Sequence, residues 1–472
     1  MHVSKRSRLR DVSYFGSLLL IAVSVVLACS PRANALPAFA RKYGLRCSAC
    51  HESWPMLNYF GQKFKDNGYQ LMNDRDAPIW QNPGYWPVTF RILPIWHRVS
   101  TGKVLVDSAA GPDSAITRIT TSGFDISGLD FHTGGTLEKN FSFYVLPSSD
   151  NSASFHFETV MARLDNLFGS PWLNIKLGKF ELDNLLSEKR ILTLTGNGGI
   201  YQLYHFSPQG DGNIWGKMGD NQLGAELMGH SWNDRTRYSL ALLSTNDGTP
   251  GLPYGNAYTG FFAASQAFDA GKAGVQRVGF YAMLGQAPTT WLTQGGGTTV
   301  VAGSGIGNKS FSREGFVGQF YFGQHLDLQV VTQHGQDSVW FGQGYGDLIG
   351  GTVSNNNTTG SLAALAPGSR APSWNGVLFE PHYIYSPQLI FVGRYETIRM
   401  SQQSTPGTPS NFGNISTYTV GYRYNPFMTS RAGFAWHNEY NWLHQDGTGP
   451  TLGLTSTNVN TSEVLLGFDF DF

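Results

Sequence analysis

The sequence predicts a mainly β fold, in which a small N-terminal α-helical segment precedes a transmembrane β-barrel of about 16 antiparallel strands. One observation is composition: 57 of 472 residues are Gly, 14% are aromatic and only 14% are charged, against about 25% charged in ordinary soluble domains. Another is the lack, after the N-terminal leader, of any uncharged apolar run long enough for a membrane helix. The third is repeated alternation of apolar and polar residues.

Equal numbers of basic and acidic residues, 33 of each, give a formal net charge of zero. A balanced chain of this kind offers no extended basic surface to a polyanion. We therefore expect no nucleic-acid partner.

The first residues have the pattern of an exported protein. Four basic residues come first: Lys5, Arg6, Arg8 and Arg10. An apolar run follows from Tyr14 to Ala28, and then the small-residue triplet Ala33-Asn34-Ala35. This predicts a signal peptide over residues 1–35, since the apolar run is shorter than the roughly 20 residues of a membrane-spanning helix. An alternative is a lipoprotein cut before Cys29, because Val26 to Cys29 loosely resembles a lipobox.

The last residues alternate most clearly. Val464, Leu466, Phe468, Phe470 and Phe472 alternate with Glu463, Leu465, Gly467, Asp469 and Asp471. A strand of a soluble sandwich has the same period, but the terminal Phe resembles the final strand of bacterial outer-membrane barrels.

Short and long connections alternate between the predicted strands. Three hairpins are closed by Gly323–His325, Ser386–Gln388 and Asn425–Ser430. Long stretches rich in Gly, Ser, Thr and Asn separate them: residues 286–314, 334–376, 401–416 and 443–461. Long loops are uncommon in compact soluble domains, whereas membrane barrels have short periplasmic turns and long outer loops.

The alternation gives about 16 strands. We expect them to start near Val88, Thr117, Phe141, Phe155, Leu173, Gln222, Arg235, Tyr258, Arg277, Gly315, Leu326, Val377, Leu389, Tyr418, Ala432 and Glu463. An even number places both chain ends on one side of the membrane. Because the first expected strand starts near Val88 and the last reaches Phe472, the predicted barrel occupies residues 88–472.

The segment before the barrel, residues 36–87, contains the chemistry-bearing motif Cys47-Ser48-Ala49-Cys50-His51. Cys-x-x-Cys-His is the attachment motif of c-type haem, in which two thiols form thioethers and the histidine ligates the iron. A thioredoxin-like redox pair would need a βαβ context, and a zinc site would need further Cys or His ligands. We predict one covalent haem c held by Cys47, Cys50 and His51.

The second axial ligand stays open. Met72 is the preferred candidate, beyond a helix expected from Trp54 to Asn67. Met56, His97, water and an open site are alternatives. A segment of about 50 residues is near the lower limit for independent folding. We therefore expect the haem to supply part of its core and the segment to pack into or against the barrel mouth.

The haem segment resembles outer-membrane cytochrome–porin fusions, whose best-known members are bacterial iron oxidases. The matching residues are Leu36 to Arg41, Cys47 to His51, Pro55, Leu57-Asn58, Phe60-Gly61, Phe64 and Gly68-Tyr69. The resemblance implies a haem on Cys47, Cys50 and His51 that passes electrons from extracellular Fe(II), or another donor, to a periplasmic carrier such as a soluble cytochrome. It also implies contact with outer-membrane lipid.

Two function classes follow. One is an electron-transfer protein of the outer membrane, acting as an Fe(II) oxidase. The other is a solute-conducting porin in which the haem segment serves as a plug or a redox sensor. Haem reduction by Fe(II) favours the first class, and ion conductance without such reduction favours the second.

Overall fold

The computed structural model describes most of the predicted barrel and much of the segment before it. The described residues are 38–53, 56–71, 76, 78–81, 88–106, 115–149, 154–183, 221–244, 257–287, 290–292, 298–300, 308–338, 371, 373–401, 414–428, 432–446 and 458–471. The predicted signal peptide, Met72 and Phe472 lie outside these residues. Within the described part of the chain, no helix is long and apolar enough to cross a membrane.

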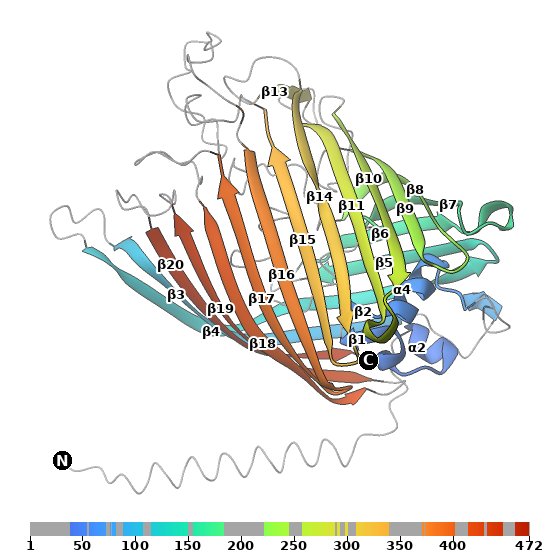
Figure 1. The fold of residues 1–472 in the computed structure, drawn as a ribbon, viewed down its shortest axis with the longest axis horizontal. Helices are drawn as coiled ribbons and strands as arrows, with labels where there is room; N and C mark the ends of the chain where they lie inside the picture. Colours follow the sequence, from blue (N-terminus) through green and yellow to red (C-terminus); the bar gives the residue numbers. More distant parts are fainter. Residues whose placement is uncertain are drawn as a thin grey trace, which may run out of the picture.

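Sixteen strands form a closed barrel in which every neighbouring pair is antiparallel (Figure 1). They are β3 (Val88–Val106), β4 (Ala115–Glu138), β5 (Phe141–Ser149), β6 (His156–Leu164), β7 (Asn174–Phe180), β8 (Gln222–His230), β9 (Thr236–Ser244), β10 (Tyr258–Asp269), β11 (Val275–Ala287), β14 (Lys309–Phe322), β15 (Leu326–Gln336), β16 (Ser373–Ser386), β17 (Leu389–Met400), β18 (Ile415–Met428), β19 (Gly433–Asp446) and β20 (Asn458–Asp471). The last strand closes on the first, with Leu465 opposite His97. The predicted fold class is confirmed.

Several strands extend further than the alternation indicated. β14 begins at Lys309 rather than near Gly315, and β18 continues through Asn425, which had been placed in a turn. Asn425 is 2% exposed and therefore belongs to the barrel wall. Polar residues on the inner face of a barrel resemble loop residues in sequence, because the lumen is polar.

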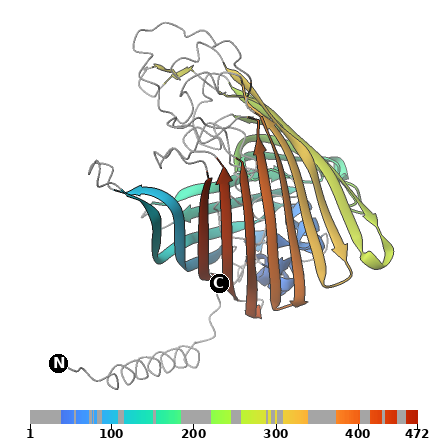
Figure 2. The ribbon, with the colours of Figure 1, turned by 60° about the vertical axis from the view of Figure 1, so that its left-hand side comes forward.

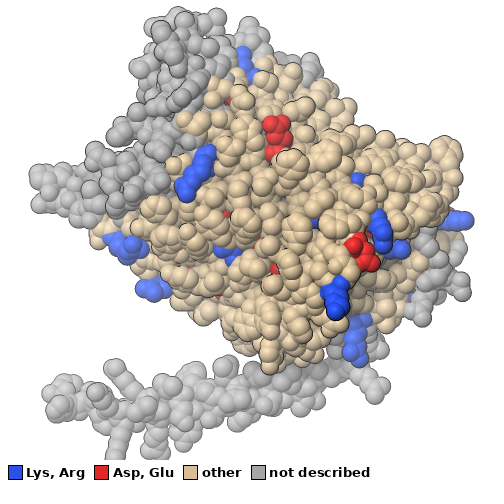
Figure 3. Space-filling model, in the orientation of Figure 1, with Lys and Arg blue, Asp and Glu red and all other residues tan. Residues whose placement is uncertain are grey.

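The two faces of the wall have opposite character. On β18, Thr419 and Arg423 are buried in the lumen, whereas Tyr418 and Val420 are 49% and 60% exposed on the outside. Figure 3 shows one outer face with few charged side chains. This arrangement explains the low charged fraction of the sequence, because the outward-facing residues of the strands are mostly uncharged (Figure 3) and the charged side chains gather inside the barrel.

The N-terminal segment lies in one end of the barrel, at the short connections Gly323–His325 and Pro387–Gln388 (Figures 1 and 2). It contains α2 (Ala38–Tyr43), α3 (Cys47–Cys50), β1 (His51–Ser53), β2 (Met56–Leu57), α4 (Tyr59–Asp66) and the 3-10 turn η1 (Ile79–Gln81). The helix expected from Trp54 was wrong in its start, because Asn58 caps α4 and Met56 and Leu57 pair with β1. Elsewhere, β12 (Thr290–Leu292) pairs with β13 (Thr298–Val300), and two further 3-10 turns, η3 (Leu167–Gly169) and η7 (Gly271–Ala273), follow β6 and β10.

Candidate functional site

The Cys-x-x-Cys-His motif forms a single helical turn. Cys47 and Cys50 are the ends of α3, and the backbone N–H of His51 donates to the carbonyl of Cys47. Residues three apart on a helix lie on one face, so both thiols are presented together with the imidazole next in the chain. This is the donor set that covalent c-type haem attachment uses.

Neither thiol is in a disulfide, and both are partly buried. Burial raises the pKa of Cys47 to about 11, with a further contribution from the Asp471 carboxylate, and burial raises the pKa of Cys50 to about 11. A thioredoxin-like pair needs a lowered thiol pKa. Among the described residues, neither thiol belongs to a cluster of three metal-ligating side chains.

Asn58 holds the motif against α4. Its side-chain oxygen accepts a hydrogen bond from the Gly61 N–H at 2.9 Å, and its amide nitrogen donates to the Ala49 carbonyl at 3.0 Å. A Cβ on Gly61 would lie 2.1 Å from the Cys50 carbonyl oxygen. The motif and α4 are therefore in backbone contact, which only glycine permits at position 61.

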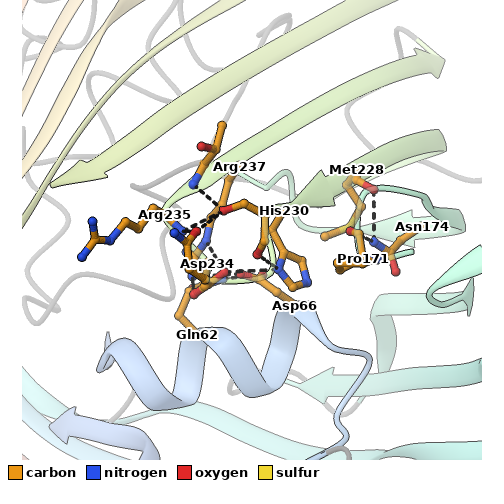
Figure 4. A network of polar contacts seen from close by, with 12 residues as sticks. Gln62, Asp66, Pro171, Asn174, Met228, His230, Asp234, Arg235 and Arg237 are labelled. Carbon is orange, nitrogen blue, oxygen red and sulfur yellow. Dashed lines mark hydrogen bonds and ion pairs between the residues drawn. The ribbon is translucent and has the colours of Figure 1, made fainter. Parts of the chain in front are cut away.

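Ionic and backbone contacts seat α4 on the barrel wall. Figure 4 shows Asp66, at the end of α4, beside Arg237 of β9. The Arg237 guanidinium lies 3.0 Å from the Asp66 carboxylate, and the Lys65 ammonium lies 3.3 Å from the carboxylate of Glu181, which follows β7. Arg163 of β6 donates to the Lys65 carbonyl at 2.8 Å and also to that of Asp66. These partners come from several strands, so the segment is fixed inside the lumen.

An aromatic stack joins the segment to β5. Phe39 stacks on Tyr69 with ring centroids 4.8 Å apart, and Tyr69 stacks on Tyr144 at 5.9 Å. The Tyr43 hydroxyl donates to the Tyr69 carbonyl at 2.9 Å. These rings are part of the main apolar cluster inside the barrel.

Of the side chains considered as second ligands, the structure describes Met56 and His97. Met56 is 1% exposed and packs on Ile390 and Val392, with its Sδ 3.5 Å from the Gln329 amide. His97 lies in β3 of the barrel wall, opposite Leu465 of β20 and Gly123 of β4. Met72 lies outside the described residues.

A second group of side chains meets beside the motif. Glu52, which follows His51, meets Asp327 of β15 and His382 of β16, and potential ligand atoms of all three lie within 4.8 Å of one another. Burial, followed by the nearby Asp327 carboxylate, raises the pKa of Glu52 to about 8. Sequence reasoning missed this group because its members are far apart in the chain and share no local spacing.

A closed antiparallel barrel of 16 strands with a helical segment inside one end is a porin-like architecture. No family model and no curated protein matches the chain. Among solved structures it is similar to OprB of Pseudomonas putida, with 11% identity, 83% of this chain and 96% of that chain covered, and a TM-score of 0.45. It is also similar to OmpF of Salmonella typhi in complex with daunomycin, with 11% identity, coverages of 81% and 97%, and a TM-score of 0.44. OmpT of Vibrio cholerae gives 9% identity, coverages of 81% and 98%, and a TM-score of 0.42.

Proposed function

We propose that the chain is an electron-transfer protein of the bacterial outer membrane, in which Cys47, Cys50 and His51 hold one haem c inside a porin-like barrel. Electrons would pass from extracellular Fe(II) to a periplasmic carrier such as a soluble cytochrome. The observation that carries the proposal is the position of the motif, which lies within the barrel and is fixed to its wall.

The outer surface supports a place in lipid. Large apolar side chains such as Phe124, Leu242 and Phe316 are 90%, 60% and 70% exposed on described strands. A monomeric soluble protein rarely exposes so much apolar surface, whereas a membrane barrel requires it. Short turns lie on the periplasmic side of such barrels, so the segment faces the periplasmic carrier.

The chain's own residues position the redox group. A haem on this motif would supply a one-electron iron couple whose potential depends on its axial ligands and on burial. Asn58 and Gly61 fix the motif to α4, and Arg163 and Arg237 fix α4 to the wall. The attachment site would thus be held inside the barrel, at the end where the short connections lie (Figure 1).

The haem is tested by a pyridine haemochrome assay on the purified protein. We expect one c-type haem per chain, and Cys50→Ser should abolish normal covalent attachment. Zero haem, or bound zinc in place of iron, would contradict the proposal.

Electron transfer is tested in vesicles containing the oriented protein. External Fe(II) should reduce the haem, and His51→Ala should remove that activity while the unheated protein still migrates as a folded barrel on gels. A wild-type haem that dithionite reduces but Fe(II) leaves oxidised over a range of pH would sink the iron-oxidase function.

The alternative is a solute-conducting porin in which the haem segment is a plug or redox sensor. It is favoured by the contacts that fix the segment to β6 and β9 in the lumen. Ion conductance in planar bilayers without any Fe(II)-dependent haem reduction would select this alternative.

A further inference from the structure

Glu52, Asp327 and His382 converge from three elements of the fold. Asp327 and His382 are directly opposite each other on the neighbouring strands β15 and β16, and both are fully buried. Glu52 reaches them from β1, and its Oε1 accepts a hydrogen bond from the Tyr321 hydroxyl at 3.3 Å. The group thus connects the haem-bearing segment to the barrel wall.

Several carboxylate oxygens of this group have no hydrogen-bond donor. Neither Oε2 of Glu52 nor Oδ2 of Asp327 has a hydrogen-bond partner, although both atoms are buried. Within the described residues, no Lys or Arg lies in ion-pair distance of either carboxylate. Buried carboxylates are stabilised by pairing or by binding a metal. Among the described residues the imidazole of His382 is the one basic side chain paired with these two carboxylates, so a bound metal ion would supply the buried oxygens with a further partner.

The imidazole is oriented as a metal ligand would be. Nε2 of His382 lies 2.8 Å from the Glu380 carboxylate, which leaves Nδ1 facing Asp327. Nδ1 lies 2.8 Å from Oδ1 of Asp327, yet neither atom makes a hydrogen bond of acceptable geometry. A ligating histidine commonly gives its other ring nitrogen to a carboxylate in this way.

We propose that Glu52, Asp327 and His382 form a binding site for one divalent first-row transition-metal ion. An imidazole with two carboxylates suits Fe(II) and Mn(II), and the carboxylates of Glu52, Asp327 and Glu380 around one imidazole favour a dication. The next step rests on the proposed function: the site would hold the electron donor Fe(II) at Glu52, the residue that follows His51. Each Fe(II) would lose one electron and become Fe(III), and one ferric haem would become ferrous.

Manganese binding tests the site without redox chemistry. Mn(II) is added to the full-length haem-loaded protein in detergent, and the six-line EPR signal of free Mn(II) is followed. We expect one tight Mn(II) per chain, with affinity at least tenfold weaker in Asp327→Asn and in His382→Gln. His437→Gln is the matched control, because His437 is also buried in the wall beside a carboxylate, Glu439, and it should bind as the wild type does.

A second measurement needs no variant. Pulsed EPR of Mn(II) bound to the wild-type protein should show coupling to an imidazole nitrogen. The site is overturned if the wild type binds no Mn(II), if that nitrogen coupling is missing, or if both site variants bind Mn(II) as tightly as the control.

The donor role is measured separately by the rate at which Fe(II) reduces the haem. We expect Asp327→Asn to slow this rate at least tenfold while haem content stays unchanged. An equal rate in Asp327→Asn and wild type would overturn the donor role and leave the proposed function standing. Mn(II) binding together with no reduction by Fe(II) in the wild type would overturn the proposed function and leave the metal site standing.

Discussion

Gly61 shows how a single residue sets the position of the motif. A Cβ at this position would lie 2.1 Å from the carbonyl oxygen of Cys50, and backbone cannot yield as a flexible side chain would. Gly61→Ala should therefore cost about 1–3 kcal/mol in the packing of α4 on the motif. We expect haem content, measured by the haemochrome assay, to fall several-fold while the barrel still forms.

The control is the same change at Gly123 of β4, where a Cβ would meet nothing within 4 Å. Gly123→Ala should leave haem content unchanged. If both variants lose haem equally, or if neither does, close packing at Gly61 has no special role.

At the scale of residues, contacts within one short stretch of sequence could be predicted, whereas contacts between distant stretches could not. Cys47, Cys50 and His51 form a contiguous pattern, so their juxtaposition on one turn could be predicted. The meeting of Glu52 with Asp327 and His382 could not, because it depends on strand register and on the segment entering the lumen.

At the scale of elements, Asn58 has two roles that can be separated. It caps α4 by accepting from the Gly61 N–H, and it ties α3 to α4 by donating to the Ala49 carbonyl. Losing an N-cap costs about 0.5–2 kcal/mol. Asn58→Ala should speed hydrogen exchange of the backbone amides of α4, as measured by mass spectrometry.

Asn58→Asp keeps the capping oxygen and removes the donor. Exchange in α4 should then stay near the wild-type rate while α3 exchanges faster. Identical exchange in α3 for Asn58→Asp and the wild type would show that the donated hydrogen bond is not needed.

The contact between α4 and β9 is expected to control the opening of the lumen. Arg237 pairs with Asp66 of α4 at 3.0 Å, whereas the side chain of Arg235 points away from this group in Figure 4. Arg237→Gln removes the cation that lies beside two buried carboxylates, Asp66 and Asp234, so the segment should loosen. We expect ion conductance in planar bilayers to rise several-fold for Arg237→Gln and to stay unchanged for Arg235→Gln, and equal conductance in both variants would contradict this role.

Element boundaries were predicted less well than element existence. The strands were identified because alternation has an intrinsic period of two, but β14 and β18 continue through polar residues that face the lumen. The start of α4 was misjudged because residues before Asn58 pair as a short β ladder with His51 and Ser53. That pairing depends on the chain reversing direction after the motif, and the alternation of apolar and polar residues does not predict such a reversal.

At the scale of the whole molecule, the distribution of charge follows from the barrel itself. Residues 469 and 471 of β20 illustrate this, because these aspartates face the lumen near Arg91 while the alternate side chains face outward. The count of strands and their closure were predictable from such patterns. The seating of the N-terminal segment in the lumen was expected only from its small size, and its particular partners Arg163 and Arg237 could not be named in advance.

The outward face should tolerate charge only near its rim. Val420 lies in the middle of β18 and is 60% exposed, whereas Val275 is the first residue of β11, beside a turn, and is 40% exposed. An arginine on the lipid face costs about 2–4 kcal/mol at the bilayer midplane and about 0–1 kcal/mol near the interface. We therefore expect Val420→Arg to lower the free energy of unfolding in lipid vesicles, measured by urea titration, by several times more than Val275→Arg. Equal losses for the two variants would mean that the apolar outer surface of β18 is not buried in lipid.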